Sequence, residues 1–286
     1  MVIDPTLSKQ PIKIIRAGNT ELVLCFLHFL ESQNIDFDHS HLHRFLKHLY
    51  ASSGYFDQSS TDLDGFTTIL ESYLNTWKNS LQESELLVLQ DSLNEINHIS
   101  PEHKKTFFDS LRLSKLTFRN SFDYNLLSTL TQGHRTLVVS PFAPIMQKQY
   151  ETGKLKFIRP QFEPSALKTF RFPYLFQSNF YSNSIQALEQ LSVEIGQIVK
   201  QSNSQSIVFS CGCYGAPLAD HFYRQGLDAI YFGGDLQIYF GIMGNRWRST
   251  FQNQPWFEKQ KSYWIMEVTP EFVPPNSGSI ENACYW

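Results

Sequence analysis

Three short stretches of this sequence place glycines beside polar or charged residues, and each one follows an apolar run of strand length. They are Arg16-Ala17-Gly18-Asn19-Thr20-Glu21, Cys211-Gly212-Cys213-Tyr214-Gly215 and Gly233-Gly234-Asp235. Glycine allows a ligand or a second backbone to approach closely, so all three stretches are candidate ligand-binding turns. The chemistry that their other residues allow differs from one stretch to the next.

The first stretch supports two kinds of binding. A strand that ends at Gly18 and then opens a helix presents backbone N–H groups at a positive helix end, which suits a phosphate. The oxygens of Asn19 and Glu21 are alternatively suited to a divalent cation. A structural interpretation is also open, because Asn19 can cap a helix while Glu21 complements the helix dipole.

The second stretch places Gly212 and Gly215 on either side of Tyr214. Small residues at this point allow a phosphate to approach the backbone. The spacing does not match GxGxxG, so the dinucleotide-binding fingerprint is absent. A turn that needs a positive φ angle explains the same glycines equally well.

The third stretch leads into a polar and aromatic segment. Asp235 and Gln237 can form hydrogen bonds to ribose or sugar hydroxyls, and Arg246 can neutralise a diphosphate. Trp247 can stack on a base or a sugar ring. The alternative is that Arg246 forms an ordinary ion pair and Trp247 belongs to the core.

Composition excludes several classes of protein. The net charge is −3, from 24 basic and 27 acidic residues without a basic stripe, which disfavours nucleic-acid binding. The four cysteines show no disulfide or zinc spacing and are typical of reduced thiols. The chain begins without an apolar signal core and has no apolar run of transmembrane length. We therefore expect a cytoplasmic protein without a transmembrane segment.

Apolar runs of strand length alternate with amphipathic helical segments along the chain. Strands are predicted over 12–17, 136–142, 156–160, 206–212 and 229–234. Helices are predicted over 22–32, 41–52, 63–81, 85–96, 100–113, 144–151, 183–202 and 213–226, with a structured loop over 160–182 and an irregular but packed tail over 249–286.

This alternation predicts a fold of the α/β class. We expect one domain over residues 1–286, built on a mostly parallel, Rossmann-like sheet with helices on both faces. Residues 33–133 are expected to form a helical insertion or cap after the first strand–helix unit. Ligands bind such sheets at the carboxyl ends of the strands, where all three glycine-containing stretches would lie.

Several stretches together resemble one bacterial family. They are residues 14–21, 136–150, 210–247 and the closing Glu-Asn-Ala-Cys-Tyr-Trp. The family comprises glycosyltransferase-like proteins of GT-D fold that are associated with surface-polysaccharide genes. The resemblance covers most of 12–32 and 135–286, and it is weak over 33–133. The block 210–247 is its most specific part, because order, spacing and residue types all match there.

The resemblance implies roles for individual residues. In GT-D proteins a D-x-E element acts with a metal and a nucleotide-sugar diphosphate, and the corresponding residues here are Asn19-Thr20-Glu21. Asn19 and Glu21 would hold Mn²⁺ or Mg²⁺, with metal dependence weakened because an amide replaces the first acid. Ser140 stands where relatives often have His. Glu21 and Asp235 are the implied catalytic residues, in metal or base roles.

The implied nucleotide-sugar site is larger than the catalytic pair. It comprises Arg16, Gly18, Asn19, Gly212, Tyr214, Gly215, Gly233, Gly234, Gln237 and Arg246. The resemblance implies transfer of a sugar from a nucleotide-sugar donor to a glycan, lipid-linked or protein acceptor. Two alternatives stay open. One is a catalytically degenerate protein that binds nucleotide sugar or assists polysaccharide assembly. The other is a different nucleotide- or phosphate-using enzyme on a similar sheet.

Overall fold

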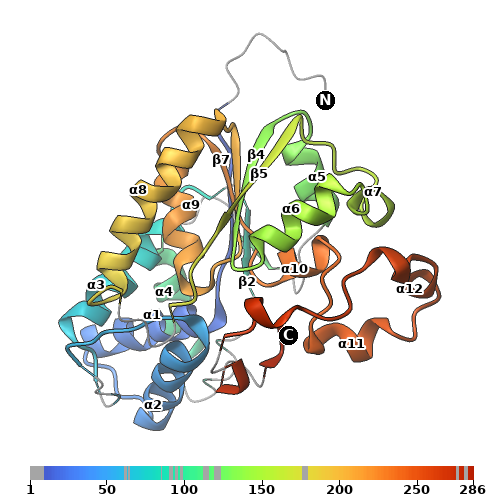
Figure 1. The fold of residues 1–286 in the computed structure, drawn as a ribbon. Helices are drawn as coiled ribbons and strands as arrows, with labels where there is room; N and C mark the ends of the chain where they lie inside the picture. The colour runs from blue at the N-terminus through green and yellow to red at the C-terminus, as the bar shows by residue number, and fades with distance from the viewer. Residues whose placement is uncertain are drawn as a thin grey trace.

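A parallel β-sheet forms the centre of the molecule (Figure 1). The computed structural model describes residues 10–60, 63, 65–84, 86–89, 93, 96, 99–111, 116–118, 124–175, 180–274, 277–279 and 283–286. Within them, the strands are β1 (Lys13–Arg16), β2 (Leu86–Leu89), β3 (Leu116–Phe118), β4 (Arg135–Ser140), β5 (Ala166–Arg171), β6 (Ser206–Phe209) and β7 (Asp228–Tyr231). Their order is β3-β2-β1-β7-β6-β4-β5, and every pairing of these strands is parallel.

Helices cover both faces of the sheet. The helices described in the chain are α1 (Asn19–Ser32), α2 (His39–His48), α3 (Thr68–Ser80), α4 (Pro101–Ser110), α5 (Tyr124–Thr131), α6 (Ala143–Glu151), α7 (Leu155–Ile158), α8 (Ser184–Ser202), α9 (Gly215–Tyr223), α10 (Asp235–Tyr239), α11 (Asn245–Phe251) and α12 (Pro255–Gln260). In Figure 1, α8 and α9 lie on one side of the strands, and α5 and α6 lie on the other. None of the helices described has the apolar length needed to cross a membrane.

Successive side chains along each strand point to opposite faces of the sheet. Ile14 and Ile230 are buried in one apolar cluster with Met146 of α6, while Ile15 and Ala229 belong to the other. This period of two is what a strand buried on both faces requires, and it explains the nearly continuous apolar runs. The predicted α/β class, with a mostly parallel sheet and helices on both faces, is confirmed.

Two predicted elements around residue 160 are wrong. The strand expected over 156–160 is instead helix α7, and the edge strand β5 lies inside the segment predicted as a loop. The apolar run near residue 156 is too short for its hydrophobic period to distinguish a helix from a strand. In β5, Leu167 is buried while the neighbouring Lys168 is exposed. Polar residues on an edge strand of this kind weaken the apolar signal.

The segment 33–133 contributes strands as well as helices. Helices α2, α3 and α4 overlap the helices predicted over 41–52, 63–81 and 100–113, whereas α5 was not predicted. The helix predicted over 85–96 is wrong for Leu86–Leu89, which form β2 and pair with β1. A run of four apolar residues fits both the helical and the strand period, so pairing with β1 decides that a strand forms. Much of the rest of 85–96 lies outside the described residues.

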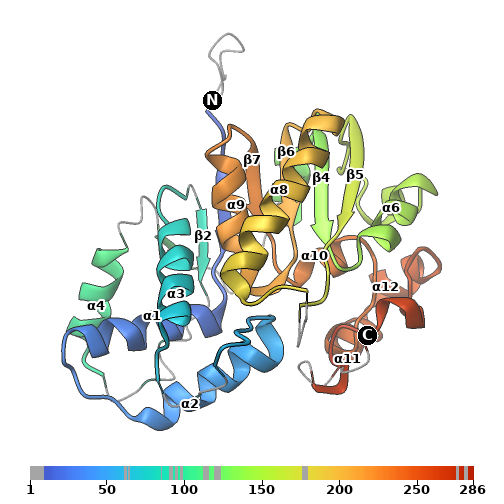
Figure 2. The same cartoon turned by 60° about the vertical axis from the view of Figure 1, so that its left-hand side comes forward.

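The strand connections create a crevice at one end of the sheet. Helix α6 follows β4 onto one face, whereas α9 follows the neighbouring β6 onto the opposite face. Ligands bind in α/β proteins where such connections diverge at the carboxyl ends of strands. Figure 2 shows α2 and the C-terminal segment, which begins at α11, beyond this same end of the sheet. The fold therefore offers a site between these two segments and the strand ends.

Candidate functional site

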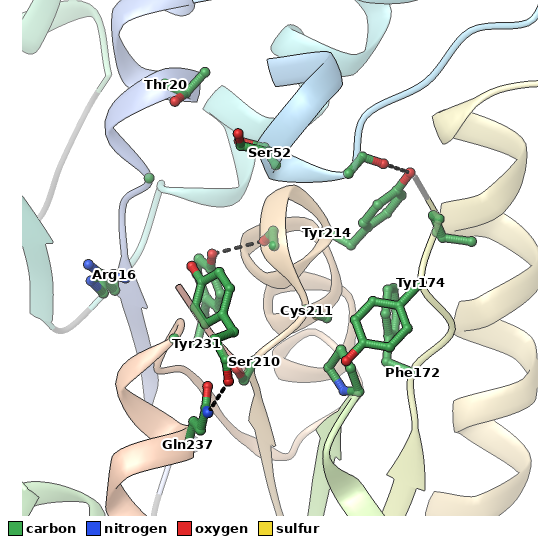
Figure 3. Close-up of a pocket in the computed structure, with 18 of the residues that line it drawn as sticks. Arg16, Thr20, Ser52, Phe172, Tyr174, Ser210, Cys211, Tyr214, Tyr231 and Gln237 are labelled. Atoms are coloured by element: carbon green, nitrogen blue, oxygen red, sulfur yellow. Dashed lines mark hydrogen bonds between the residues drawn. The ribbon is translucent and has the colours of Figure 1, made fainter. Parts of the chain in front are cut away.

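A cavity of about 530 Å³ occupies the carboxyl end of the sheet. Its lining includes residues that end or directly follow five strands: Gly18 after β1, Pro141 after β4, Phe172 after β5, Ser210 after β6, and Tyr231 of β7. The end of α2, the π-helical turn Leu49–Ser53 (η1) and the C-terminal segment supply further lining residues. Figure 3 shows side chains from the ends of β1, β5, β6 and β7 and from η1 around one space: Arg16, Phe172, Ser210, Tyr231 and Ser52. A ligand site was expected at the carboxyl ends of the strands, and the structure has a cavity of ligand size there.

Glu21 lies at the base of this cavity, in the first turn of α1. It is 4% exposed, and its carboxyl group occupies the space beside Gly18. Burial raises the pKa of this carboxyl group from 4.5 to about 6, although its own N–H, the Ser53 hydroxyl and the charge of Arg16 favour the ionised form. The group therefore changes protonation state close to neutral pH.

The divalent cation expected at Asn19 and Glu21 stays a prediction. Asn19 Oδ1 is buried from solvent, and the Glu21 carboxyl group is turned back onto its own helix end and Ser53. In the described part of the chain, no three His, Cys, Asp or Glu residues gather as a metal site would require.

Positive charge reaches the cavity from two distant segments. Arg16 ends β1, and Arg246 comes from the first turn of α11, where its guanidinium lies 4.9 Å from the ring centre of Tyr285. Burial raises the pKa of the Tyr285 hydroxyl, and the charges of Arg246 and Arg16 oppose that shift. Both guanidinium groups therefore act on the same part of the cavity. That arrangement favours an anionic ligand group.

Aromatic rings form another side of the cavity. Trp286 packs against Tyr174 and Phe142, with ring centres 5.9 Å and 6.4 Å apart. Tyr174 Oη and Trp286 Nε1 both donate hydrogen bonds to the carbonyl of Phe272, at 2.9 Å and 2.8 Å. These shared bonds hold the two rings in place. A fixed aromatic surface of this kind suits a flat base or the apolar face of a sugar.

Gln237 of α10 joins the strand ends to the C-terminal segment. Its side chain is 1% exposed, and Nε2 donates a 2.6 Å hydrogen bond to the carbonyl of Tyr285. Its Oε1 atom is buried and has no hydrogen-bond partner among the described residues. A buried acceptor in a cavity wall is available to a hydroxyl or N–H group of a ligand.

Comparisons with known proteins yield fold similarities alone. No family model matches the chain, and no curated protein matches it. One similar solved structure is described as domain of unknown function 1792 with a distinct glycosyltransferase fold. It is 14% identical, with a TM-score of 0.36, over 78% of this chain and 79% of that one. A second, a selenomethionine-substituted structure of domain of unknown function 1792, is 14% identical, with a TM-score of 0.40, over 91% and 86%. Similarity this low says nothing of the chemistry of this chain.

The cavity brings together most of the residues singled out in the sequence. They are Arg16, Gly18, Asn19, Glu21, Gly212, Tyr214, Gly234, Gln237 and Arg246. Tyr214 is held by structural contacts, since its hydroxyl donates to the carbonyl of Gly54 at 2.9 Å and lies 2.9 Å from Ser184 Oγ. The expectation that distant strand ends share one space therefore agrees with the cavity.

Three expected site residues lie outside the cavity lining. Asp235 begins α10, where its charge acts on the hydroxyl of Tyr124 in α5 rather than on the cavity. A Cβ at Gly215 would meet the ring of Tyr231, and a Cβ at Gly233 would meet the Arg16 side chain. These two glycines make room for protein side chains, and their contact with a ligand stays a prediction.

Several residues that line the cavity were not predicted as site residues. They are Thr20, His48, Ser52, Ser53, Gly54, Pro141, Phe142, Phe172, Pro173, Tyr174, Leu175, Ser210, Tyr231, Tyr285 and Trp286. Thr20 lies in the first glycine-containing stretch, and the large aromatic residues at 285–286 predict a packed segment. His48 sits in an amphipathic helix whose pattern resembles that of any surface helix.

Proposed function

We propose that this chain is a glycosyltransferase that binds a nucleotide sugar in the cavity at the carboxyl end of the sheet. The observation that carries the proposal is the pairing of a cationic region with a fixed aromatic surface in one cavity. Arg16 and Arg246 supply the charge, and Tyr174 and Trp286 supply the rings. In Figure 3, Arg16 lies on one side of the labelled residues and Tyr174 on the other. A nucleotide sugar has matching anionic and flat parts.

The reaction would use the cationic region to stabilise the leaving group. An acceptor hydroxyl oxygen forms a bond to the anomeric carbon, and the bond from that carbon to the phosphate oxygen breaks. Its electron pair leaves with the diphosphate, and the hydroxyl proton passes to solvent or to a base. Arg16 and Arg246 are in place to offset the charge that develops on the diphosphate. The resemblance of residues 210–247 to GT-D proteins supports the same reaction.

A second function is a protein that binds nucleotide sugar without transferring it. One observation favours this alternative: among the described lining residues, Glu21 alone carries a side-chain carboxyl group, and that group is buried against Gly18. Such a protein would act in the assembly of a glycan or a lipid-linked or protein conjugate. The two functions predict the same donor binding and differ only in turnover.

Nucleotide binding by matched variants tests the shared part of both functions. A panel of nucleoside diphosphates is titrated against wild type, Arg246→Gln and Arg248→Gln. Arg248 is a suitable control because it lies on the same helix but outside the cavity lining, with Nη2 bonded to the Met266 carbonyl. We expect one diphosphate to bind wild type and Arg248→Gln alike, with Arg246→Gln weaker by about tenfold.

Two outcomes of this titration would contradict the proposal: no diphosphate binds wild type, or Arg246→Gln binds as tightly as wild type. Release of nucleoside diphosphate from the matching nucleotide sugar then separates the two functions. Release that increases when an acceptor is added supports the transferase. Donor binding without release or transfer supports the non-catalytic protein.

A further inference from the structure

His48 is held at the cavity by one of its two ring nitrogens. It ends α2, and Nδ1 lies 2.9 Å from Oγ1 of Thr20, which is buried in the first turn of α1. The contact fixes the orientation of the ring. No hydrogen-bond partner of Nε2 occurs among the described residues, and the side chain keeps exposed surface at the cavity. Nε2 is therefore the nitrogen that a ligand can reach.

Burial and the charge of Arg246 oppose protonation of His48 in the protein without ligand. Arg246 approaches from α11, and Arg44 and Lys47 belong to the same helix as His48. On α1, Glu21 is buried against Gly18 and is hydrogen-bonded to Ser53. Partial burial lowers the pKa of His48, and the charge of Arg246 lowers it further. Both effects favour the neutral imidazole of His48 before a ligand binds.

Breaking the donor creates a new charge on the diphosphate. In a nucleotide sugar, the sugar-linked phosphate is a diester-like group with a single ionisable proton, which is lost at neutral pH. After transfer, the same phosphate is terminal and has a second ionisation with a pKa of about 6. The extra negative charge therefore appears only as the bond to the sugar breaks. Arg246, the cation assigned above to the diphosphate, is also the charge that acts on His48.

We propose that His48 takes up a proton from solvent as the terminal phosphate beside Arg246 gains its second negative charge. The imidazolium then donates from Nε2 to a terminal phosphate oxygen, while Thr20 holds Nδ1. His48 would stabilise the departing diphosphate more strongly than the intact donor, and such differential binding accelerates transfer. This inference rests on the proposed function, because it needs a nucleoside diphosphate in the cavity.

Calorimetry can count the proton directly. Wild type is titrated at pH 7.5 with the nucleoside diphosphate that binds best, in two buffers of different ionisation enthalpy. His48→Gln is measured in the same way, and His43→Gln serves as the control because His43 is exposed on the same helix and does not line the cavity. We expect uptake of about half to one proton per bound diphosphate in wild type and His43→Gln, and close to none in His48→Gln.

The intact nucleotide sugar provides the second comparison. Wild type should take up far less proton with it, and His48→Gln should lose preference for the diphosphate over the nucleotide sugar by about three- to tenfold. Equal proton uptake by wild type and His48→Gln, or an unchanged preference, would overturn the role of His48 alone. Failure of every diphosphate to bind wild type would overturn the proposed function and this inference together.

A measurement without a variant guards against misfolding of His48→Gln. The ring of His48 is titrated by NMR in wild type, with and without the diphosphate. The midpoint should move to higher pH when the diphosphate is bound, because the nearby negative charge favours the imidazolium. An unmoved midpoint would contradict the proposal.

Discussion

The carboxyl group of Glu21 occupies the space that a Cβ atom at Gly18 would need. Gly18 has φ −69° and ψ 136°, a conformation that any residue adopts, so space and not backbone freedom requires glycine there.

Gly18→Ala should consequently displace the Glu21 carboxyl group and lower the free energy of unfolding by about 1–3 kcal/mol. Urea denaturation measures the loss. Gly65→Ala is the control, because no atom lies within 4 Å of the Cβ that it would add. Equal stability of the two variants would show that the Glu21 carboxyl group moves aside without cost.

Burial of Glu21 predicts a dependence of stability on pH. Its pKa is raised from 4.5 to about 6 in the folded protein, so the folded state holds the proton more tightly than the unfolded chain. Below pH 4.5 both states are protonated at this site. As pH rises through 6, the unfolded chain gains more from ionisation, and the folded state loses about 2 kcal/mol of stability.

Glu21→Gln should remove this loss. The variant should gain about 2 kcal/mol relative to wild type at pH 7.5, and this gain should disappear at pH 4. Urea denaturation of both proteins at the two pH values gives the comparison. A difference in stability that stays constant with pH would show that Glu21 ionises normally in the folded protein.

Gly212 has φ +57°, and a Cβ there would collide with the carbonyl oxygen of Ser53 in η1. Gly226 also has a positive φ, of +89°, but no atom lies within 4 Å of its Cβ position. Gly226→Ala should therefore cost only backbone strain, about 1 kcal/mol. Gly212→Ala should cost at least about 2 kcal/mol more, because a backbone atom must move. Thermal unfolding of both variants tests the difference, and similar melting temperatures would show that η1 yields freely.

Trp286 is expected to provide a stacking surface for the flat part of the donor. Trp286→Leu should weaken binding of the preferred nucleoside diphosphate by about fivefold, since an aromatic contact contributes about 1 kcal/mol. Trp256→Leu is the control, because Trp256 is 41% exposed and does not line the cavity. Titration calorimetry compares the two. Equal affinity in both variants would remove Trp286 from the nucleotide site.

The sequence predicted the class of fold because the relevant signals are local. The apolar run before Gly18 and the helical pattern after it belong to neighbouring residues, and β1 and α1 form there. The same local reasoning failed at β5, where an edge strand carries Lys168 and Arg171, and at β2, where four apolar residues fit a helix or a strand. In both places the structure is decided by a neighbouring strand that local sequence does not specify.

The candidate site was predicted only as far as strand ends could be placed. Arg16, Glu21 and Gln237 were expected near one another because parallel strands share a carboxyl end, and all three line the cavity. Asp235 was expected there too, but it stands two residues before Gln237 on a short helix and acts on Tyr124. One helical step of 100° separates successive side chains, so neighbours in sequence need not face the same space.

The sequence by itself determined the α/β class and the glycine turns that end β1, β6 and β7, because backbone period and turn chemistry depend on adjacent residues. Tertiary structure alone decided which side chains share the cavity. The contact of His48 with Thr20 spans 28 residues, and that of Gln237 with Tyr285 spans 48. Contacts over such separations follow from strand order and from the path of the C-terminal segment. No local pattern encodes either, since each depends on how the whole chain buries its apolar surface.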